Sequence, residues 1–342
     1  MKKIILSLAI LAFAASCSNV DDSIETIETP QTEKPYANGF LILNEGAMGS
    51  SNADVSFIKN DLSISYNNIF KINNSNTDLG DVAQFMGFDG DLAYIVMNNS
   101  NSIQIVDRYT FKKVNQITQE LNQPRAIAFS NGKIYVTNAN SKTVTVYNKS
   151  NYSFVKTIIL DQQPEGIVAA TNYVYVQSSP FASENIVEII ESTSDVNTKD
   201  LSFSNALNGI TTDGTSVYVL NSGINSTEIS KINNQEITKT IENNTLVSSR
   251  YLTLDNDNLY FTNGTGIHTL SKNLTTINTT PLFNVNDNSW STLYGFNVID
   301  GKVFSSDANG FVDESIVTIY DLTGNVLKTF STQIGTNGFY KN

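Results

Sequence analysis

Residues 124–147, PRAIAFSNGKIYVTNANSKTVTVY, contain three short runs in which Ile, Val, Tyr and Thr recur at every second position. This period of two and these residue types favour strands that bury one side. Asn131-Gly132 separates the first two runs and suits a two-residue hairpin turn, because both residues tolerate positive φ. A fourth run, VKTI, follows at residues 155–158. The stretch therefore predicts four antiparallel strands joined in chain order, which is one blade of a β-propeller.

The same unit recurs along the chain, as residues 164–176 repeat its opening. The aromatic residue of the second strand marks each unit. The markers are Tyr94, Tyr135, Tyr175, Tyr218, Tyr260 and Phe304, with Leu41 in the seventh unit. Successive aromatic markers lie 40 to 44 residues apart, whereas Leu41 and Tyr94 are 53 residues apart. These units predict an all-β fold, a seven-bladed β-propeller of four-stranded antiparallel blades.

The first unit has no strand before Gly39, and the end of the chain supplies one. Residues 335–340, GTNGFY, resemble the start of a unit, but no second strand follows them. We expect this segment to pair with residues 40–44 as the innermost strand of the first blade. The pairing would close the ring and cover a strand edge that would otherwise be exposed.

The N-terminal residues indicate export. Lys2 and Lys3 precede an apolar run that is too short to span a bilayer of roughly 30 Å, and small residues lead to Cys17. This order predicts a lipoprotein signal peptide over residues 1–16 and lipidation of Cys17; the alternative is a buried or incidental thiol. Residues 17–38 are acidic and poor in aromatic residues, which predicts a disordered tether. The propeller is expected over residues 39–342.

Composition excludes several function classes. The chain carries 33 acidic and 21 basic residues, which disfavours nucleic acid as a partner. A single cysteine allows no intramolecular disulfide. One histidine and one cysteine cannot assemble the commonest soft-metal sites, although hard-cation sites made of oxygen ligands stay open. We predict no cofactor, and we expect a monomer.

Function is expected at one end of the propeller, where loops between second and third strands and loops between blades gather around the axis. We call this end the mouth face. Ten residues before each marker, at the start of the innermost strands, stand Gln84, Arg125, Glu165, Asn208, Arg250 and Tyr294, with Asn337 completing the ring. A structural role would favour one residue type at equivalent positions. Because this first ring is chemically diverse, we predict that it contacts a ligand.

A second ring lies three residues after each marker. It consists of Asn44, Met97, Asn138, Ser178, Asn221, Asn263 and Asp307. We include its Asn and Asp residues among the candidate ligand contacts. The alternative is structural, since Asn and Asp at strand ends bond the adjacent backbone.

Aromatic residues add to the mouth face. Trp290, Phe181 and Tyr251 are predicted to lie in or beside its loops and, with Arg and Asn, to offer a surface to a flat molecule with polar edges. Alternatively, Trp290 packs between the sixth and seventh blades. His268 lies on a third strand, and we expect it to be a surface residue away from the mouth.

The chain resembles the YncE-like seven-bladed propellers, and most closely a group of Bacteroidota surface lipoproteins. The resemblance rests on GFLILNEG at residues 39–46, NADVS at 52–56, PRAI at 124–127 and PEGI at 164–167. Ala47-Met48 and Asp54-Val55 depart mildly from that group's pattern. Members include a cobalamin-binding lipoprotein that passes the vitamin to a TonB-dependent transporter. The resemblance implies that Asn44, Glu45 and the two rings contact a corrinoid, on a protein anchored in the outer membrane at the cell surface.

The sequence is compatible with three functions. The leading hypothesis is a binding module, attached to the membrane only through its lipid, that captures a small molecule, such as cobalamin, for a TonB-dependent outer-membrane transporter. The first alternative is a protein-binding scaffold or adhesin. The second is a lyase or hydrolase that uses Glu165 with Arg125 or Arg250.

Overall fold

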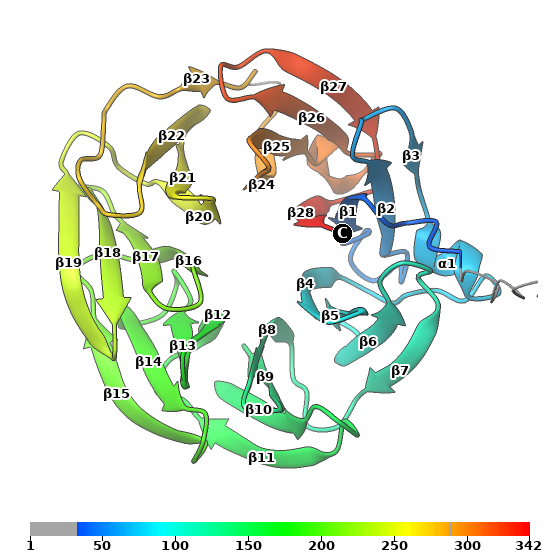
Figure 1. Cartoon of the computed structure of the whole chain (residues 1–342), viewed down its shortest axis with the longest axis horizontal. Coiled ribbons are helices and arrows are strands. Elements are labelled where there is room, and N and C mark those ends of the chain that lie inside the picture. Colours follow the sequence, from blue (N-terminus) through cyan, green and yellow to red (C-terminus); the bar gives the residue numbers. More distant parts are fainter. Residues whose placement is uncertain (1–32, 287–288) are drawn as a thin grey trace, which may run out of the picture. The chain divides into compact units, whose positions relative to one another are not determined.

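The computed structural model describes residues 33–286 and 289–342. The described residues form seven four-stranded antiparallel sheets arranged as blades around a central axis (Figure 1), which confirms the predicted fold. The predicted signal peptide and Cys17 lie outside the described residues. No helix within the described ranges is long and apolar enough to cross a membrane.

The strands run outward from the axis in chain order in every blade but the first. Blade 1 consists of β28 (Thr336–Lys341), β1 (Gly39–Asn44), β2 (Asp54–Lys59) and β3 (Ser65–Tyr66); blade 2 of β4 (Ala83–Asp89), β5 (Leu92–Met97), β6 (Ser102–Asp107) and β7 (Lys113–Ile117); blade 3 of β8 (Pro124–Ser130), β9 (Lys133–Asn138), β10 (Thr143–Asn148) and β11 (Phe154–Ile159). Blade 4 consists of β12 (Pro164–Ala170), β13 (Tyr173–Ser178), β14 (Ile186–Glu191) and β15 (Val196–Ser202); blade 5 of β16 (Leu207–Thr212), β17 (Val217–Ser222), β18 (Thr227–Asn233) and β19 (Glu236–Asn243). Blade 6 consists of β20 (Arg250–Asp255), β21 (Asn258–Asn263), β22 (Gly266–Ser271) and β23 (Phe283–Asn284); blade 7 of β24 (Thr292–Ile299), β25 (Lys302–Asp307), β26 (Ile316–Asp321) and β27 (Val326–Ser331). A short helix, α1 (Ile69–Asn73), follows β3, and a 3-10 turn, η1 (Asn309–Phe311), follows β25.

The C-terminal strand closes the ring as predicted. In the pairing of β28 with β1, Tyr340 lies opposite Leu41 and Phe339 lies opposite Ile42. Phe339 is buried with its ring 5.5 Å from that of Phe304 in blade 7. The Tyr340 hydroxyl accepts a hydrogen bond of 3.1 Å from the Met86 N–H in blade 2. The last strand of the chain thus joins blade 1 to both of its neighbours.

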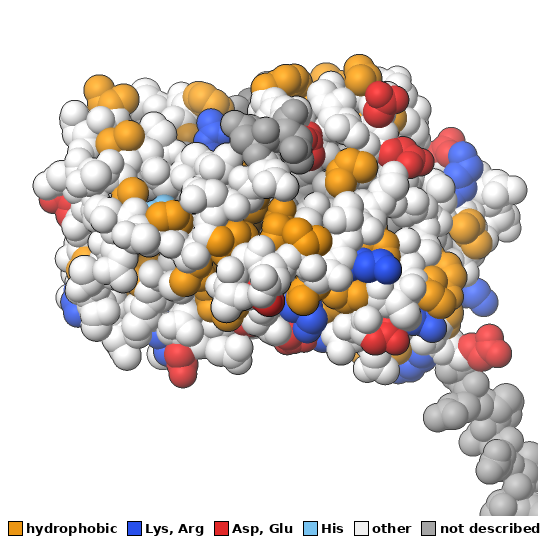
Figure 2. All heavy atoms as spheres, turned by 90° about the horizontal axis from the view of Figure 1, so that it is seen from above, with side chains coloured by type: hydrophobic (Ala, Val, Ile, Leu, Met, Phe, Trp, Pro, Cys, Tyr) orange, Lys and Arg blue, Asp and Glu red, His pale blue; other side chains and the backbone are white. Residues whose placement is uncertain are grey.

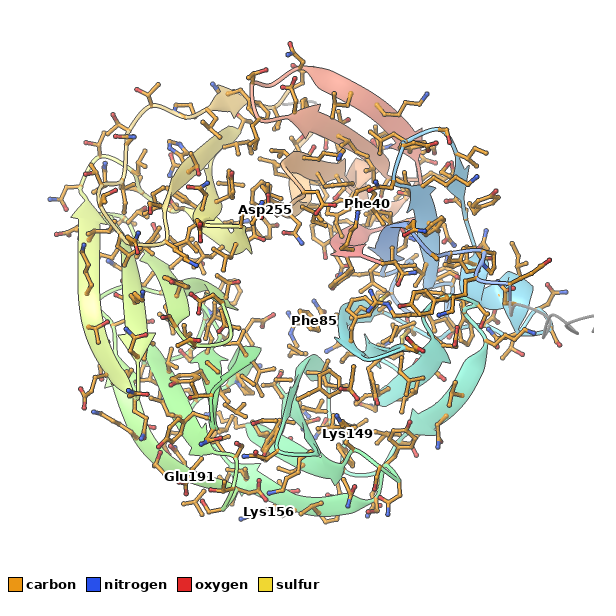
Figure 3. The ribbon with its side chains drawn as sticks, viewed as in Figure 1. Phe40, Phe85, Lys149, Lys156, Glu191 and Asp255 are labelled. Atoms are coloured by element: carbon orange, nitrogen blue, oxygen red, sulfur yellow. The ribbon has the colours of Figure 1, made fainter. Side chains whose placement is uncertain are left out.

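The hydrophobic core lies between adjacent sheets. All seven markers are buried, and none is more than 4 % exposed. Each marker side chain packs against residues of the next blade. The Tyr94 ring of blade 2, for instance, lies 4.8 Å from the Phe129 ring of blade 3. Burying one large apolar side chain contributes about 1.5–3 kcal/mol. Figure 3 shows Phe85 beside the axis and Lys156 and Glu191 on the outer rim.

Two of the hairpin turns between first and second strands follow from their sequences. Asn131 and Gly132 have φ values of 46° and 71°, and Asp300 and Gly301 have values of 51° and 69°. A two-residue turn with positive φ at both positions matches the twist of its strands. The short-range signal therefore identifies these turns correctly.

Two residues lie elsewhere than the sequence predicts. His268 is 3 % exposed on β22, where its ring stacks 5.1 Å from that of Phe261, so its assignment to the surface is wrong. Tyr36, placed in the tether by its sequence context, is buried against Phe57 and Phe111. Asn342 donates a hydrogen bond of 2.6 Å to the Tyr36 carbonyl. The propeller unit accordingly begins at Lys34 rather than at Gly39.

Candidate ligand-binding site at the mouth face

Every innermost strand is irregular near its mouth end. The register shifts between Ala83 and Phe85 in β4, Pro124 and Ile127 in β8, Pro164 and Ile167 in β12, Leu207 and Gly209 in β16, Arg250 and Thr253 in β20, and Thr292 and Gly295 in β24, while in β28 Thr336 and Gly338 pair with consecutive residues of β1. The residues skipped at these bulges include Gln84, Arg125, Glu165, Asn208, Tyr251, Tyr294 and Asn337. A β-bulge bends its strand and re-aims a side chain. The first-ring residues at these bulges therefore take no part in regular strand pairing. Blade 6 differs, because Tyr251 occupies its bulge while Arg250 pairs with Thr262.

Arg125 joins the first-ring residues of three blades. Its Nη1 donates a hydrogen bond of 2.7 Å to Gln84 Oε1 of blade 2, and its Nε donates one of 3.0 Å to Glu165 Oε1 of blade 4. The Arg125 and Glu165 side chains are 26 % and 33 % exposed, so the ion pair remains accessible from the mouth. A planar guanidinium holding two acceptors in a fixed fork gives this part of the ring a defined geometry.

Glu45 organises the other side of the ring. Its Oε2 accepts a hydrogen bond of 2.8 Å from the Tyr294 hydroxyl, and its Oε1 accepts one of 2.7 Å from Asn337 Nδ2. Asn337 also donates to the Gln84 carbonyl at 3.2 Å. Tyr251 extends the connection, because its hydroxyl donates to the Tyr294 carbonyl at 2.6 Å. One chain of polar contacts, which we call the mouth cluster, therefore links blades 6, 7, 1, 2, 3 and 4.

Burial sets the protonation of this cluster. Burial raises the pKa of Glu45 above its usual value. The hydrogen bonds from Tyr294 and Asn337 and the charge of Arg125 lower this pKa, but burial is the larger effect. Burial raises the pKa of Tyr294, and the neighbouring Glu45 carboxylate raises it further. Burial also raises the pKa of Tyr251 to about 12. Both tyrosines therefore keep their protons at neutral pH and can act as hydrogen-bond donors.

The cluster is interrupted at blade 5, and Arg250 lies next to Tyr251 at its blade 6 end. Asn208 donates to the carbonyls of Ala206 and Ser222, at 3.2 and 3.0 Å, and so bonds to the backbone of its own blade. Arg250 is exposed, and its guanidinium makes no hydrogen bond or ion pair with any residue that the structure describes. An exposed guanidinium beside an ordered polar cluster is available to an acceptor on a ligand.

An aromatic wall borders the mouth cluster. Trp290 is 80 % exposed, and its ring lies 5.8 Å from that of Phe311 in η1. The Phe311 ring in turn meets the Tyr294 ring edge-on at 4.6 Å. Trp290 is thus not buried between blades 6 and 7. The repeat pattern does not point to Phe311, because this residue lies in a loop that has no counterpart at a fixed offset in the repeat.

The second-ring residues brace the loops. Asn44, Asn138 and Asn221 have no exposed surface. Asn138 Nδ2 donates to Thr145 Oγ1 at 2.8 Å, and Asn44 Oδ1 accepts from Thr336 Oγ1 at 2.6 Å. The remaining two behave alike: Asn263 donates to the Val247 carbonyl at 2.6 Å, and Asp307 accepts from Ser289 at 2.6 Å and from Ser291 at 2.8 Å. These contacts match the structural alternative, and the candidate site is therefore built without them.

Other residues of the predicted site lie apart from the cluster. Phe181 is 92 % exposed in the loop between β13 and β14, and its ring does not stack on any aromatic ring of the described residues. Within residues 33–286 and 289–342, no group of three or more His, Cys, Asp and Glu side chains is placed to hold a metal. The candidate site therefore consists of Glu45, Gln84, Arg125, Glu165, Arg250, Tyr251, Trp290, Tyr294, Phe311 and Asn337.

Fold and site together define a β-propeller protein with a polar, aromatic-edged site at one end of its axis. Residues 38–251 match the family described as a domain of unknown function, DUF5074, and the chain belongs to this family. No curated protein matches its sequence.

Similar solved structures share the fold. A quinonprotein alcohol dehydrogenase-like protein from Bacteroides thetaiotaomicron has 15 % sequence identity and a TM-score of 0.70, over 90 % of this chain and 79 % of that one. BamB from Moraxella catarrhalis has 15 % identity and a TM-score of 0.53, over 89 % and 86 % of the two chains. At such identities the likeness concerns the propeller architecture alone.

Proposed function

We propose that the mouth face binds a small molecule and releases it unchanged. The observation that carries this proposal is the mouth cluster, in which six blades order polar side chains beside Arg250, a guanidinium without a partner among the described residues. Such preorganised groups beside an aromatic wall recognise a ligand with polar edges and a flat or apolar body. Glu165 is held by Arg125, and His268 is buried on a third strand, which leaves few groups for acid–base chemistry.

A corrinoid is the first ligand to test, on the strength of the sequence resemblance to cobalamin-binding surface lipoproteins. Isothermal titration calorimetry would measure cobalamin binding to the full chain. We expect Arg250→Ala and Trp290→Ala each to weaken binding about tenfold or more, since each removes a charged donor or a large contact surface. Both residues are exposed, so neither change should alter the melting temperature.

Lys328→Ala provides a matched control, because Lys328 is an exposed cation on the outermost strand β27. This variant should bind like the unmodified protein. An absence of heat at micromolar protein would reject the corrinoid. Turnover of a ligand that Glu165→Gln abolishes would reject binding without catalysis and support the lyase or hydrolase alternative.

Docking to a partner protein is the second candidate function. Among the described residues, six large hydrophobic side chains are more than three-quarters exposed, and all six lie in mouth-face loops or at the mouth end of a strand: Met48, Ile159, Phe181, Ile224, Trp290 and Val312. Figure 2 shows the propeller from the side, with hydrophobic side chains spread over this surface, some of them along its upper edge. Exposed apolar side chains concentrated on one face are typical of interaction surfaces.

The chain enters the propeller on the opposite face. Tyr36 N–H donates to the Tyr109 carbonyl at 3.0 Å, in the loop between β6 and β7. The mouth face lies on the side away from this contact, and we propose that it is the side that docks to an outer-membrane transporter. A pull-down with the unmodified chain, and with Trp290→Ser combined with Val312→Ser, would test docking. We expect the transporter to be recovered only by the unmodified chain.

A further inference from the structure

Blade 1 carries an insertion that the mouth cluster does not use. Its repeat is 53 residues long, against 40 to 44 in the others. The additional residues form α1 and the segment that leads from it to β4. Asp54 of β2 fixes this insertion, because its carboxylate accepts hydrogen bonds from the N–H groups of Phe70 at 2.9 Å and Lys71 at 3.0 Å. Ile69 and Phe70 are buried, so the insertion is an integral part of the fold.

The insertion forms one wall of a hollow. The hollow measures about 280 Å³, is open to solvent, and lies between α1, the β1–β2 loop and the connection from β27 to β28. It is separate from the mouth cluster. Ile334 lines the hollow, whereas the next residue, Gly335, lies against Glu45 and Phe311. Two backbone hydrogen bonds lie between the hollow and the mouth cluster: Glu45 N–H donates to the Gly335 carbonyl at 2.9 Å, and Gly46 N–H donates to the Ile334 carbonyl at 3.0 Å.

The polar groups of the hollow are oriented by bonds among themselves. Gln333 Nε2 donates to Asn68 Oδ1 at 2.7 Å, which leaves the Asn68 amide nitrogen as a donor. Asn52 Oδ1 accepts from the Ala47 N–H at 2.8 Å, which leaves its amide nitrogen as a second donor. No residue described by the structure accepts from either nitrogen.

Carboxylates supply the acceptors. Glu314 accepts from Ser331 through Oε2, which leaves Oε1 to the hollow. Lys71 Nζ pairs with Asp78 Oδ1 at 2.7 Å, which leaves Asp78 Oδ2. The hollow therefore offers both donors and acceptors, and its described lining contains no aromatic side chain.

We propose that this hollow binds a single sugar ring, neutral or positively charged. A hydroxyl group both donates and accepts, so the hydroxyls of one sugar ring can bond to amide donors and carboxylate acceptors in the same hollow. The volume lies at the small end of the usual range for ligand pockets, roughly 300–1,000 Å³. Asp54, Asp78 and Glu314 face one cation, Lys71, so an anionic sugar is repelled. The proposal is independent of the ligand at the mouth cluster.

Saturation-transfer NMR on the full chain tests the proposal with three probes: D-glucosamine, D-glucose and D-glucuronate. We expect glucosamine and glucose to bind with millimolar affinity and glucuronate to bind at least tenfold more weakly. Glu314→Ala and Asp78→Asn should each weaken glucosamine binding about tenfold, because each removes a charged acceptor at an exposed site. Arg250→Ala, at the mouth, is the control and should leave sugar binding unchanged.

Three outcomes would overturn the proposal. The first is no saturation transfer from any of the three sugars. The second is binding that survives both Glu314→Ala and Asp78→Asn, which would place the sugar elsewhere. The third is loss of sugar binding in Arg250→Ala, which would assign it to the mouth cluster. Melting curves of each variant confirm that the propeller is folded.

Discussion

The two rings of repeat positions have different roles, because one lies on the first strands of the blades and the other on the second strands. Asn138 ends a second strand and is fully buried; its side chain bonds to Thr145 of its own blade and accepts from the Asn122 N–H in the connection from blade 2. Arg125 occupies a bulge on a first strand and reaches the blades on both sides. The sequence shows directly that the first ring is chemically diverse. It does not reveal which residues of that ring meet.

Glu188 on β14 gives the stability of the protein a pH dependence. The residue is 3 % exposed, and burial raises its pKa to about 7. A carboxyl whose pKa is higher in the folded than in the unfolded chain binds protons more tightly when folded, so its contribution to stability is lost as pH rises. The loss occurs between about pH 4.5 and pH 7 and levels off above that range. Glu45, whose pKa is also raised, acts in the same direction.

We expect Glu188→Gln to flatten this dependence. Urea unfolding of the original chain should show a free energy of unfolding that falls by up to about 3 kcal/mol from pH 4.5 to pH 7.5 on account of Glu188. The glutamine keeps an acceptor for the Asp161 and Gln162 N–H groups, which Glu188 Oε1 accepts at 3.1 and 3.4 Å. Equal pH slopes for the two proteins would show that Glu188 titrates normally.

At the scale of the element, the sequence predicts strands and hairpins well because their signals are local. The period of two, the turn residues and the missing first strand of blade 1 are all visible within a few dozen residues. The insertion that forms α1 is visible only as a longer repeat. Its fold depends on Asp54, whose contacts with Phe70 and Lys71 cannot be inferred from spacing.

Removing β28 should damage the protein far more than its terminal position suggests. A chain that ends at Gln333 loses the pairing partner of β1 and the buried Phe339. Deleting one buried Phe side chain alone costs about 3–5 kcal/mol. We expect the shortened chain to lose cooperative thermal unfolding, measured by circular dichroism, and a peptide of residues 334–342 to restore it. A shortened chain that melts like the full chain would refute the role of β28 in closure.

At the scale of the whole molecule, closure brings both ends of the propeller together. Asn342 donates a hydrogen bond to the Tyr36 carbonyl at 2.6 Å. A short Gly-Ser linker can therefore join Asn342 to Lys34, and new ends can be opened elsewhere. One permutant would begin at Thr215, between the first two strands of blade 5, and another at Ser204, between blades 4 and 5.

We expect the permutant that begins at Thr215 to melt several degrees above the one that begins at Ser204. The first keeps a blade built from both ends of the chain, so four-stranded pairing holds the ring closed. In the second, only packing between whole blades closes the ring. Differential scanning fluorimetry would compare the two melting temperatures, and equal or reversed values would show that strand exchange adds nothing to closure.

The sequence by itself determined the blade number, the four strands of each blade, the closing strand and the face that gathers the diverse residues. These properties follow from a repeated local pattern, since strand periodicity and hairpin turns depend on near neighbours. Only the tertiary structure decided that Tyr251 occupies the bulge of blade 6, that His268 is buried, and that Phe311 completes an aromatic wall. It also brought Glu45 to Tyr294 and Asn337. The contacts of Glu45 with Tyr294 and Asn337 join opposite ends of the chain. They exist only because closing the ring places the first and last blades side by side.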